Sequence, residues 1–205
     1  MNKHSSVEKA TEKLARPRIK DKRSAILRAA LAVFADGGVN GVPMPVLAER
    51  AGVGTGTIYR YFDNKEALVN ELFREEKLAV QQRLYAGLDK SLPPEEQFAA
   101  VWQRMVDFTR EAPDSYRFME LQDHRPYLDA QSRDLERKML APILGYYRSM
   151  QEKGVFRRPI RPEVLMALIW GAFVNMIKAE RDGHITLDQA DIDAARDACW
   201  GLCTG

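Results

Sequence analysis

The chain has 205 residues, of which 45% are hydrophobic and 29% charged, which is enough for one or two globular domains with an apolar core. It contains no run of eighteen apolar residues, and its first 23 residues lack the apolar stretch of a secretory signal, so we expect a cytoplasmic protein without a membrane span. Two cysteines, Cys199 and Cys203, fit a reducing compartment, and we expect them to pack in the core rather than to bind a metal.

Charge is distributed unevenly along the chain, although the formal net charge is only +2. Residues 1–66 carry 12 Lys and Arg against 7 Asp and Glu, whereas residues 67–205 carry 19 against 22. A basic N-terminal part on a mildly acidic remainder suggests that only the N-terminal part meets a polyanion. A solvated charged tail explains the first twenty residues equally well, so charge alone does not decide between the two.

Helical periodicity dominates the chain, and no stretch alternates convincingly like a strand. The apolar stripe over 22–36 predicts a first helix that Gly37 and Gly38 end. Short helices are predicted over 45–51, with a proline in the first turn, and over 55–61. The remaining helices are predicted over 64–88, 95–111, 114–122, 129–153, 162–181 and 187–203. The expected fold class is therefore all-α, with about nine helices.

The stretch "AGVGTGTIYRYFDNKEAL", residues 51–68, holds three glycines within five positions, Gly52, Gly54 and Gly56. A dinucleotide-binding loop places such glycines between a β-strand and a helix, with a further glycine at a fixed spacing. Here residues 46–51 read as a helix, the later glycine is missing, and no Gly-Lys-Ser/Thr sequence marks a P-loop. A nucleotide is therefore disfavoured, and we predict no cofactor.

A helix-turn-helix explains the same stretch residue by residue. Gly52 supplies the left-handed conformation that ends the first helix, Val53 fills the angle between the helices, and Gly56 lets the second helix approach DNA closely. Ile58 and Phe62, one turn apart, would bury the inner side of the second helix. The side chains left to point outward are Thr55, Thr57, Tyr59, Arg60 and Tyr61.

These residues also carry a resemblance to a known family. The stretches "ILRAALAVFADGGVNG" and "LAERAGVGTGTIYRYFDNKEALVNELF", within residues 22–73, resemble the tetracycline-repressor (TetR) family of bacterial transcription regulators. The resemblance implies a homodimeric DNA-binding repressor whose C-terminal domain binds a small molecule. It divides the chain into a flexible basic arm (1–19), a three-helix DNA-binding domain (20–66, with the helix-turn-helix at about 43–62), and a ligand-binding and dimerisation domain (67–205).

The resemblance further implies which residues meet double-stranded DNA. Thr55, Gly56 and Arg60 would face the bases or the groove edge. Phosphate or minor-groove contacts would come from Thr57, Tyr59, Tyr61, Lys65, Arg18, Lys20 and Arg23. Two positions depart from the family pattern: Pro45 stands where some members carry a base-reading residue, and Gly54 stands where a serine cap is common. Taken singly, the tyrosines could be ordinary half-buried aromatics and the arginine a solvated side chain.

The predicted helix over 162–181 is apolar on two sides, so both sides must be covered. Its own domain covers one side, and a second subunit is the best cover for the other. The predicted dimer interface consists of Met166, Trp170, Val174 and Ile177, with Ala194, Ala198 and Gly201 from the last helix. A monomer with an unusually buried helix is the alternative, whereas the family resemblance implies a four-helix dimer bundle.

Large, soft side chains recur through the C-terminal part. Any one of them is more often core than pocket, but together, and given the resemblance, they predict a mostly apolar effector cavity. The candidate pocket residues are Phe98, Trp102, Met105, Phe108, Tyr116, Met119, Tyr127, Met139, Tyr146, Met150, Phe173 and Met176. His124 is expected either to gate this cavity or to lie at the surface.

Enzyme motifs are missing: the chain has no Gly-x-Ser-x-Gly, no His-Glu-x-x-His and no Cys/His metal spacing, so we expect neither catalysis nor a metal site. The sequence favours a ligand-responsive transcriptional regulator, most simply a repressor that binds a palindromic operator as a dimer and is released by a small, mostly apolar effector. The alternative is a helical interaction or small-molecule-binding protein without sequence-specific DNA binding. That alternative leaves the basic N-terminal part and the polar residues over 55–61 unexplained.

Overall fold

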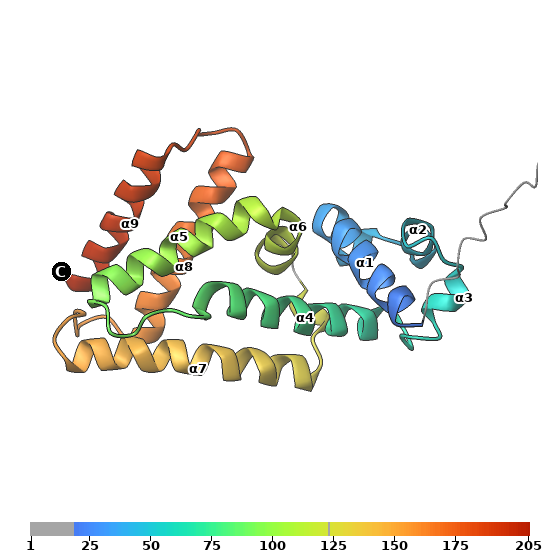
Figure 1. The fold of residues 1–205 in the computed structure, drawn as a ribbon, viewed down its shortest axis with the longest axis horizontal. Helices are drawn as coiled ribbons and strands as arrows, with labels where there is room; N and C mark the ends of the chain where they lie inside the picture. The colour runs from blue at the N-terminus through green and yellow to red at the C-terminus, as the bar shows by residue number, and fades with distance from the viewer. Residues whose placement is uncertain (1–18, 123) are drawn as a thin grey trace, which may run out of the picture.

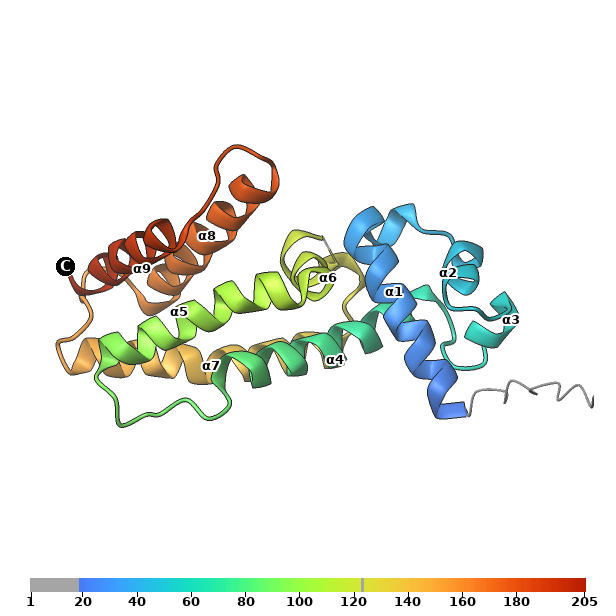
Figure 2. The same cartoon turned by 45° about the horizontal axis from the view of Figure 1, so that its top comes forward.

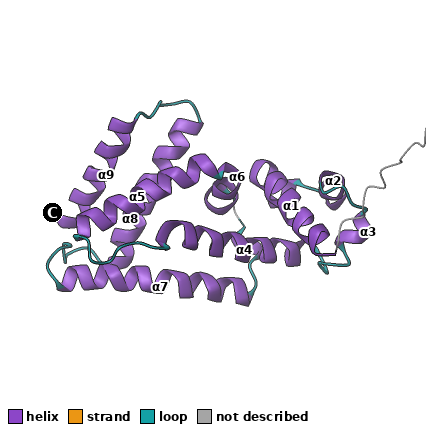
Figure 3. Ribbon diagram, viewed as in Figure 1, coloured by secondary structure: helices purple, strands orange, loops and turns teal. Residues whose placement is uncertain are grey.

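In the computed structural model, residues 19–122 and 124–205 are described, and they form nine α-helices, one π-helix and one 3₁₀-helix (Figures 1 and 3). The α-helices are α1 (Ile19–Gly41), α2 (Met44–Arg50), α3 (Thr55–Ile58), α4 (Lys65–Tyr85), α5 (Pro94–Glu111), α6 (Pro113–Tyr116), α7 (Ala130–Glu152), α8 (Pro162–Arg181) and α9 (Gln189–Thr204). The π-helix η1 spans Arg117–Leu121 and the 3₁₀-helix η2 spans Arg125–Tyr127. For the described residues, the predicted all-α class is confirmed.

Several helix boundaries differ from the predicted ones, most clearly at three places. Gly38 has a non-helical backbone with φ 67°, so the regular helix is interrupted at this glycine as predicted, but helical turns resume after it up to Gly41. The predicted helix over 55–61 is regular only to Ile58 and continues as a turn. The predicted helix over 114–122 is divided into α6 and η1, because the backbone changes there to the wider π-helical turn.

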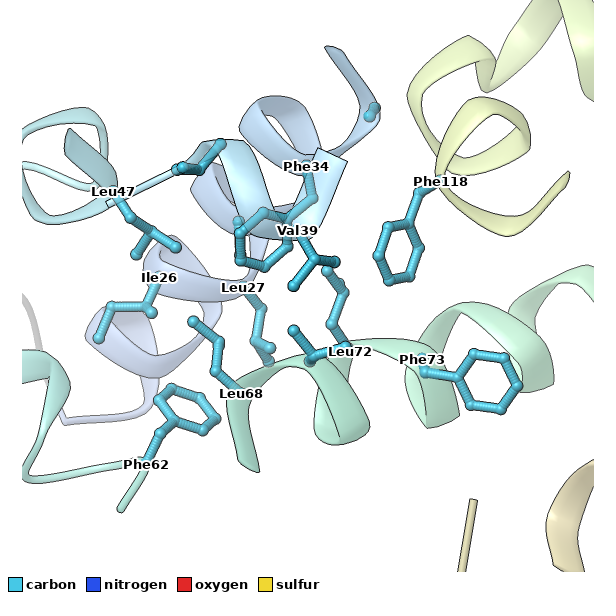
Figure 4. Close-up of a cluster of buried hydrophobic side chains, with 14 of the residues drawn as sticks. Ile26, Leu27, Phe34, Val39, Leu47, Phe62, Leu68, Leu72, Phe73 and Phe118 are labelled. Atoms are coloured by element: carbon cyan, nitrogen blue, oxygen red, sulfur yellow. The ribbon is translucent and has the colours of Figure 1, made fainter. Parts of the chain in front are cut away.

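The N-terminal head consists of α1, α2, α3 and the first half of α4, and it has a core of its own (Figure 4). Phe34, Leu47, Ile58 and Leu68 each contribute a side chain with no exposed surface, one from each of the four helices. Burying a side chain of this size stabilises the fold by about 1.5–3 kcal/mol. Asn64 caps the start of α4 by accepting a backbone hydrogen bond at 2.8 Å.

The C-terminal body consists of the second half of α4 and helices α5 to α9, which enclose a second core. In this body α4 packs on α5 and α7, α7 packs on α8, and α9 packs on α5 and α8 (Figures 1 and 2). Trp102, Phe173 and Ile192 are among the most buried side chains. Cys199 and Cys203 lie in this core as free thiols, as predicted.

Two connections join the head to the body. The first is α4, which begins in the head and ends in the body (Figure 2). The second is the segment 117–122, which leaves the body after α6 and inserts Phe118 into the head core (Figure 4). Phe118 stacks on Phe34 of α1 with ring centroids 6.5 Å apart, and Gln122 Nε2 donates to the backbone oxygen of Ala35 at 2.9 Å.

A buried amide, Asn70 of α4, holds the chain that follows this segment. Its Nδ2 donates to the backbone oxygens of Glu66 and Tyr127 at 2.9 and 2.7 Å, and its Oδ1 accepts from the N–H of Asp129 at 2.8 Å. Arg74, one turn further along α4, pairs with the carboxylate of Asp129 at 3.1 Å. Because these contacts tie α4 to the N-cap of α7, they determine where α7 begins relative to α4.

Replacing Asn70 by alanine should destabilise the protein, because the partly buried backbone oxygen of Tyr127 and N–H of Asp129 both lose their partner. We expect the free energy of unfolding in urea to fall by about 2–4 kcal/mol. Gln189→Ala is the control, because the Gln189 amide donates to Asp193 Oδ1 at 3.2 Å on the exposed surface of α9. The control should change stability by less than about 0.5 kcal/mol, and an equally small loss for Asn70→Ala would contradict its bridging role.

Candidate nucleic-acid interface

The turn between α2 and α3 is shaped by backbone hydrogen bonds. The N–H groups of Ala51 and Val53 donate to the carbonyls of Leu47 and Ala48 at 2.9 and 3.0 Å, and so close the end of α2. Between them Gly52 has a φ of 66°, which glycine adopts without a steric penalty. The left-handed conformation predicted for Gly52 is thereby confirmed.

The second helix of this motif buries one side and exposes the other. Ile58 and Phe62 are buried in the head core, whereas Tyr59 is 49% exposed and Arg60 and Gly56 are also exposed. Three further polar residues of this motif are half-buried, Thr55, Thr57 and Tyr61. A carbon added at the Cβ position of Gly56 would meet nothing within 4 Å, so a large partner can approach the backbone there. The arrangement suits a helix that enters the major groove of DNA.

A surface hollow of about 280 Å³ lies beside the turn. Its lining includes Lys22 and Ala25 of α1, the turn residues 51–54, and Thr57 of α3. The start of α1 and the second helix of the motif therefore share one surface, and Lys22 adds a positive charge to it. An ammonium next to exposed backbone is the kind of group that contacts a DNA phosphate.

Lys65, predicted to bind a phosphate, is held against the chain that joins α1 to α2. Its Nζ donates to the backbone oxygen of Val42 at 2.7 Å and lies 5.9 Å from the ring centroid of Phe34. Partial burial lowers the pKa of the ammonium. Because an ammonium has three N–H donors and the Val42 oxygen accepts from one of them, the contact leaves donors for a phosphate.

Of the other basic residues predicted to contact DNA, only Arg23 has a described side chain. Arg23 pairs with Glu71 and, at 2.7 Å, with Glu75 of α4, so two carboxylates balance its charge inside the head. Arg23 therefore ties α1 to α4 in this structure. Arg18 lies outside the described residues, and for Lys20 only its place in α1 is described.

The body core gathers nine of the twelve predicted pocket residues. They are Phe98, Trp102, Met105, Phe108, Tyr116, Tyr146, Met150, Phe173 and Met176. Met119 and Tyr127 belong to the head core instead, because the chain after α6 folds back onto α1. Met139 is buried on α7 outside both clusters. The lining of an effector cavity by the nine residues remains a prediction.

His124 is a core residue of the junction, so the surface alternative is wrong. The side chain is only 7% exposed, and its ring lies 5.0 Å from that of Phe73 and 5.5 Å from that of Phe118. Burial lowers the pKa of the imidazole, and the charge of Lys77 lowers it further. The polar neighbours of His124 in the sequence suggested exposure, because they do not reveal that this segment folds back against α4.

The core side of α8 differs from the predicted one. Ile177, predicted at the dimer interface, is buried in the body core together with Leu165, Ile169 and Phe173. Trp170 is half-buried and donates a hydrogen bond to Glu120, while Met166 and Val174 are half-buried against the core. The exposed apolar residues of α8 and α9 include Val164, Leu168, Ala194, Ala198 and Gly201. A helix that is apolar all round has no local signal for its rotation, which explains the error.

These features define a class of protein, an all-α DNA-binding regulator with a helix-turn-helix. Residues 26–72 match the family model for bacterial regulatory proteins of the tetR family, and residues 73–203 match that for the tetracyclin repressor-like C-terminal domain. The chain therefore belongs to the TetR family of transcription regulators. In the part of the chain that the structure describes, no group of three or more His, Cys, Asp or Glu side chains could hold a metal ion.

Several known proteins are similar to this chain. The uncharacterised transcriptional regulator YhgD of Bacillus subtilis is 26% identical over 175 residues, which cover 84% of this chain and 91% of that protein. The transcriptional repressor KstR of Rhodococcus jostii is 49% identical over 57 residues, or 27% of each chain. A solved structure of a TetR-family protein from Vibrio parahaemolyticus is 30% identical, with a TM-score of 0.73, and covers 89% of this chain and 98% of its own.

Lys65→Ala should weaken binding to specific and random DNA about equally. The slope of log K against log salt should become shallower by about 2 per dimer, because each subunit loses one phosphate contact. Fluorescence anisotropy at a series of salt concentrations measures this slope. Lys178→Ala, at an exposed position in the last turn of α8, is the control and should leave the slope unchanged. An unchanged slope for Lys65→Ala would mean that this side chain only tethers the Val42 backbone.

Proposed function

We propose that this regulator represses transcription by binding a palindromic operator as a homodimer in the cytoplasm, and that a small, mostly apolar effector releases it. DNA binding and transcriptional regulation follow from the family. The observation that carries the operator proposal is the exposed polar side of α3 and of the turn that follows it, where Tyr59 and Arg60 are exposed while Ile58 is buried. Two such helices, related by a two-fold axis, would enter successive major grooves roughly 34–36 Å apart.

The uncovered apolar side of α8 supports the homodimer. By length and composition α8 could cross a membrane, with a mean hydropathy of 1.3, yet only 22% of that stretch is buried within the single chain. Leu168 is 45% exposed, and Ala198 of the neighbouring α9 is exposed as well. Apolar surface of this kind marks an association site in a protein that works in water. A second copy of α8 and α9 would cover it symmetrically.

The two connections between head and body support release by an effector. α4 reaches from Lys65 at the predicted DNA surface to Leu84 in the body core, and η1 inserts Phe118 into the head. An effector that prefers a body with these elements displaced would move the two heads of a dimer out of register with the grooves. A hundredfold drop in operator affinity requires about 2.7 kcal/mol of coupling, and by reciprocity operator DNA weakens effector binding by the same factor.

An apolar effector is supported by the nine aromatic and methionine side chains that gather in the body core. A protein of the same fold, FadR of Bacillus subtilis, has been solved in complex with stearoyl-CoA, with a TM-score of 0.65 and 20% identity to this chain. That ligand belongs to FadR. It illustrates that a protein of this fold can bind a molecule with a long acyl chain, whereas the effector of the present chain depends on its own side chains.

Footprinting on the DNA upstream of the protein's own gene tests operator binding. We expect one protected site with two-fold symmetry. Arg60→Ala should cost about 1–3 kcal/mol at the base pair that the arginine contacts and so change the sequence preference. Tyr59→Phe should weaken specific and random DNA equally, because it removes a phosphate contact. Absence of any protected site on this or genomic DNA would contradict operator binding.

Leu168→Glu should split the proposed dimer, because it places an unpaired charge at a symmetric apolar interface. Sedimentation velocity should then show a monomer, and operator affinity should fall because two half-sites require two separate encounters. Leu78→Glu is the matched control, since Leu78 is an equally exposed leucine (51%) on α4. An intact dimer for Leu168→Glu would place the interface elsewhere.

A further inference from the structure

Glu120, a half-buried residue of the π-helix η1, contacts α8 through its carboxylate. Trp170 of α8 donates its indole N–H to Glu120 Oε2 at 2.9 Å. Burial raises the pKa of this carboxyl group, so its charged form lacks the stabilisation that water would provide. π-helices are rare and frequently occur at functional sites. The same π-helix places Phe118 in the head core, so Glu120 belongs to an element that both parts of the molecule share.

The charged groups around Glu120 leave an excess of negative charge. Lys77 of α4 is within electrostatic reach of Glu120, but its Nζ lies 3.7 Å from Glu136 Oε1 of α7 and is therefore shared with a second carboxylate. His124, which lies against Phe73 and Phe118 at the junction of head and body, is neutral near pH 7 because burial lowers the pKa of its imidazole. Two carboxylates thus share one ammonium. A carboxylate that is partly shielded from water and has no cation of its own favours the arrival of a positive charge.

An unpaired hydroxyl group next to Glu120 is a second, independent sign of a binding site. Tyr116, one helical turn earlier, is only 4% exposed, and its hydroxyl has no hydrogen-bond partner among the described residues. Burial raises the pKa of this tyrosine, the nearby charge of Glu120 raises it further, and the charge of Arg181 lowers it. Trp102 Nε1, deeper in the same core, is also buried and unpaired. Most buried polar groups in native proteins have a partner, so these groups indicate one that a ligand can supply.

A line of aromatic rings leads to the carboxylate. The ring centroids are 6.1 Å apart between Phe98 and Trp102, and 5.3 Å apart between Trp102 and Phe173. The next pair, Phe173 and Trp170, is 6.2 Å apart, and Trp170 bonds to Glu120. Aromatic faces attract cations and also pack well against apolar groups. The body core therefore combines an aromatic lining with a negative charge at one end.

We propose that the effector is an aromatic or similarly apolar molecule with a cationic amine, and that Glu120 binds the amine. The inference rests on the proposed effector response and adds the chemical class of the effector. The apolar part would pack along the rings from Trp102 to Trp170, and the amine would also donate to the Tyr116 hydroxyl. An anionic effector is disfavoured, because it would face two carboxylates. Because η1 carries both Glu120 and Phe118, binding of an amine at Glu120 would displace η1 and with it Phe118, which packs against α1.

Three probes with the same biphenyl body test the charge preference: biphenyl-4-methylamine, biphenyl-4-methanol and biphenyl-4-carboxylate. Calorimetric titration of each into the free, full-length protein should give the tightest binding for the amine, by at least about tenfold over the alcohol, and the weakest for the carboxylate. Glu120→Gln should abolish the advantage of the amine while leaving the alcohol within about threefold of its original affinity, because the amide oxygen still accepts from Trp170.

Glu76→Gln is the matched control, because Glu76 is another largely buried carboxylate of the body and is paired with the hydroxyl of Ser115. It should leave the ranking of the three probes unchanged. Lys77→Gln removes the ammonium that Glu120 shares with Glu136 and should therefore increase the advantage of the amine over the alcohol, which keeps the proposal testable if Glu120→Gln does not fold. A carboxylate probe that binds as tightly as the amine, an amine advantage that survives Glu120→Gln, or a lack of binding by all three probes would overturn the proposal.

These titrations use free protein, so they are independent of operator binding. Anisotropy with operator DNA is measured separately on the same preparations. Loss of operator binding together with an intact amine preference would contradict the proposed regulation but not the proposed chemical class of the ligand. Intact operator binding without an amine preference would contradict the ligand class alone.

Discussion

The stacking of Phe118 on Phe34 inside the head core is the constraint on which the arrangement of the two parts depends. Phe118 has no exposed surface, and its burial brings the segment 117–122 out of the body and against α1. Since α1 also packs on α2 and α4, this contact sets the position of the helix-turn-helix relative to the body. With α4 alone, the head and the body would be joined by a single helix and could bend against each other.

Contacts at the start, the middle and the end of α4 restrain this helix, so it forms a rigid connection between the head and the body. Lys65 fastens its first turn to the Val42 carbonyl, and Asn70 ties its middle to the start of α7. At its far end Arg104 of α5 donates to the backbone oxygens of Leu84 and Ala86 at 3.0 and 2.9 Å, where a cation also complements the helix dipole. A displacement produced in the body therefore reaches the predicted DNA surface with little loss by local bending.

The body combines two features that lower the stability of an isolated chain. Its core contains unpaired polar atoms at Trp102 and Tyr116, next to a half-buried carboxylate at Glu120, and its outer side exposes Leu168. Natural proteins depart from full satisfaction of buried polar groups mainly at functional sites. Both features are explained if the body is completed by other molecules: a ligand that pairs the polar atoms and a second subunit that covers α8.

The sequence by itself determined the all-α class, the order of the helices and the turn at Gly52, because apolar spacing and a glycine with positive φ are local signals. Only the tertiary structure decided that Ile177 faces the core, since a helix that is apolar all round shows no preferred rotation. Only the tertiary structure, too, assigned Met119 and His124 to the junction and paired Glu120 with a tryptophan fifty residues away. Those placements depend on the chain after α6 folding back onto α1, and such long-range contacts leave no trace in local periodicity.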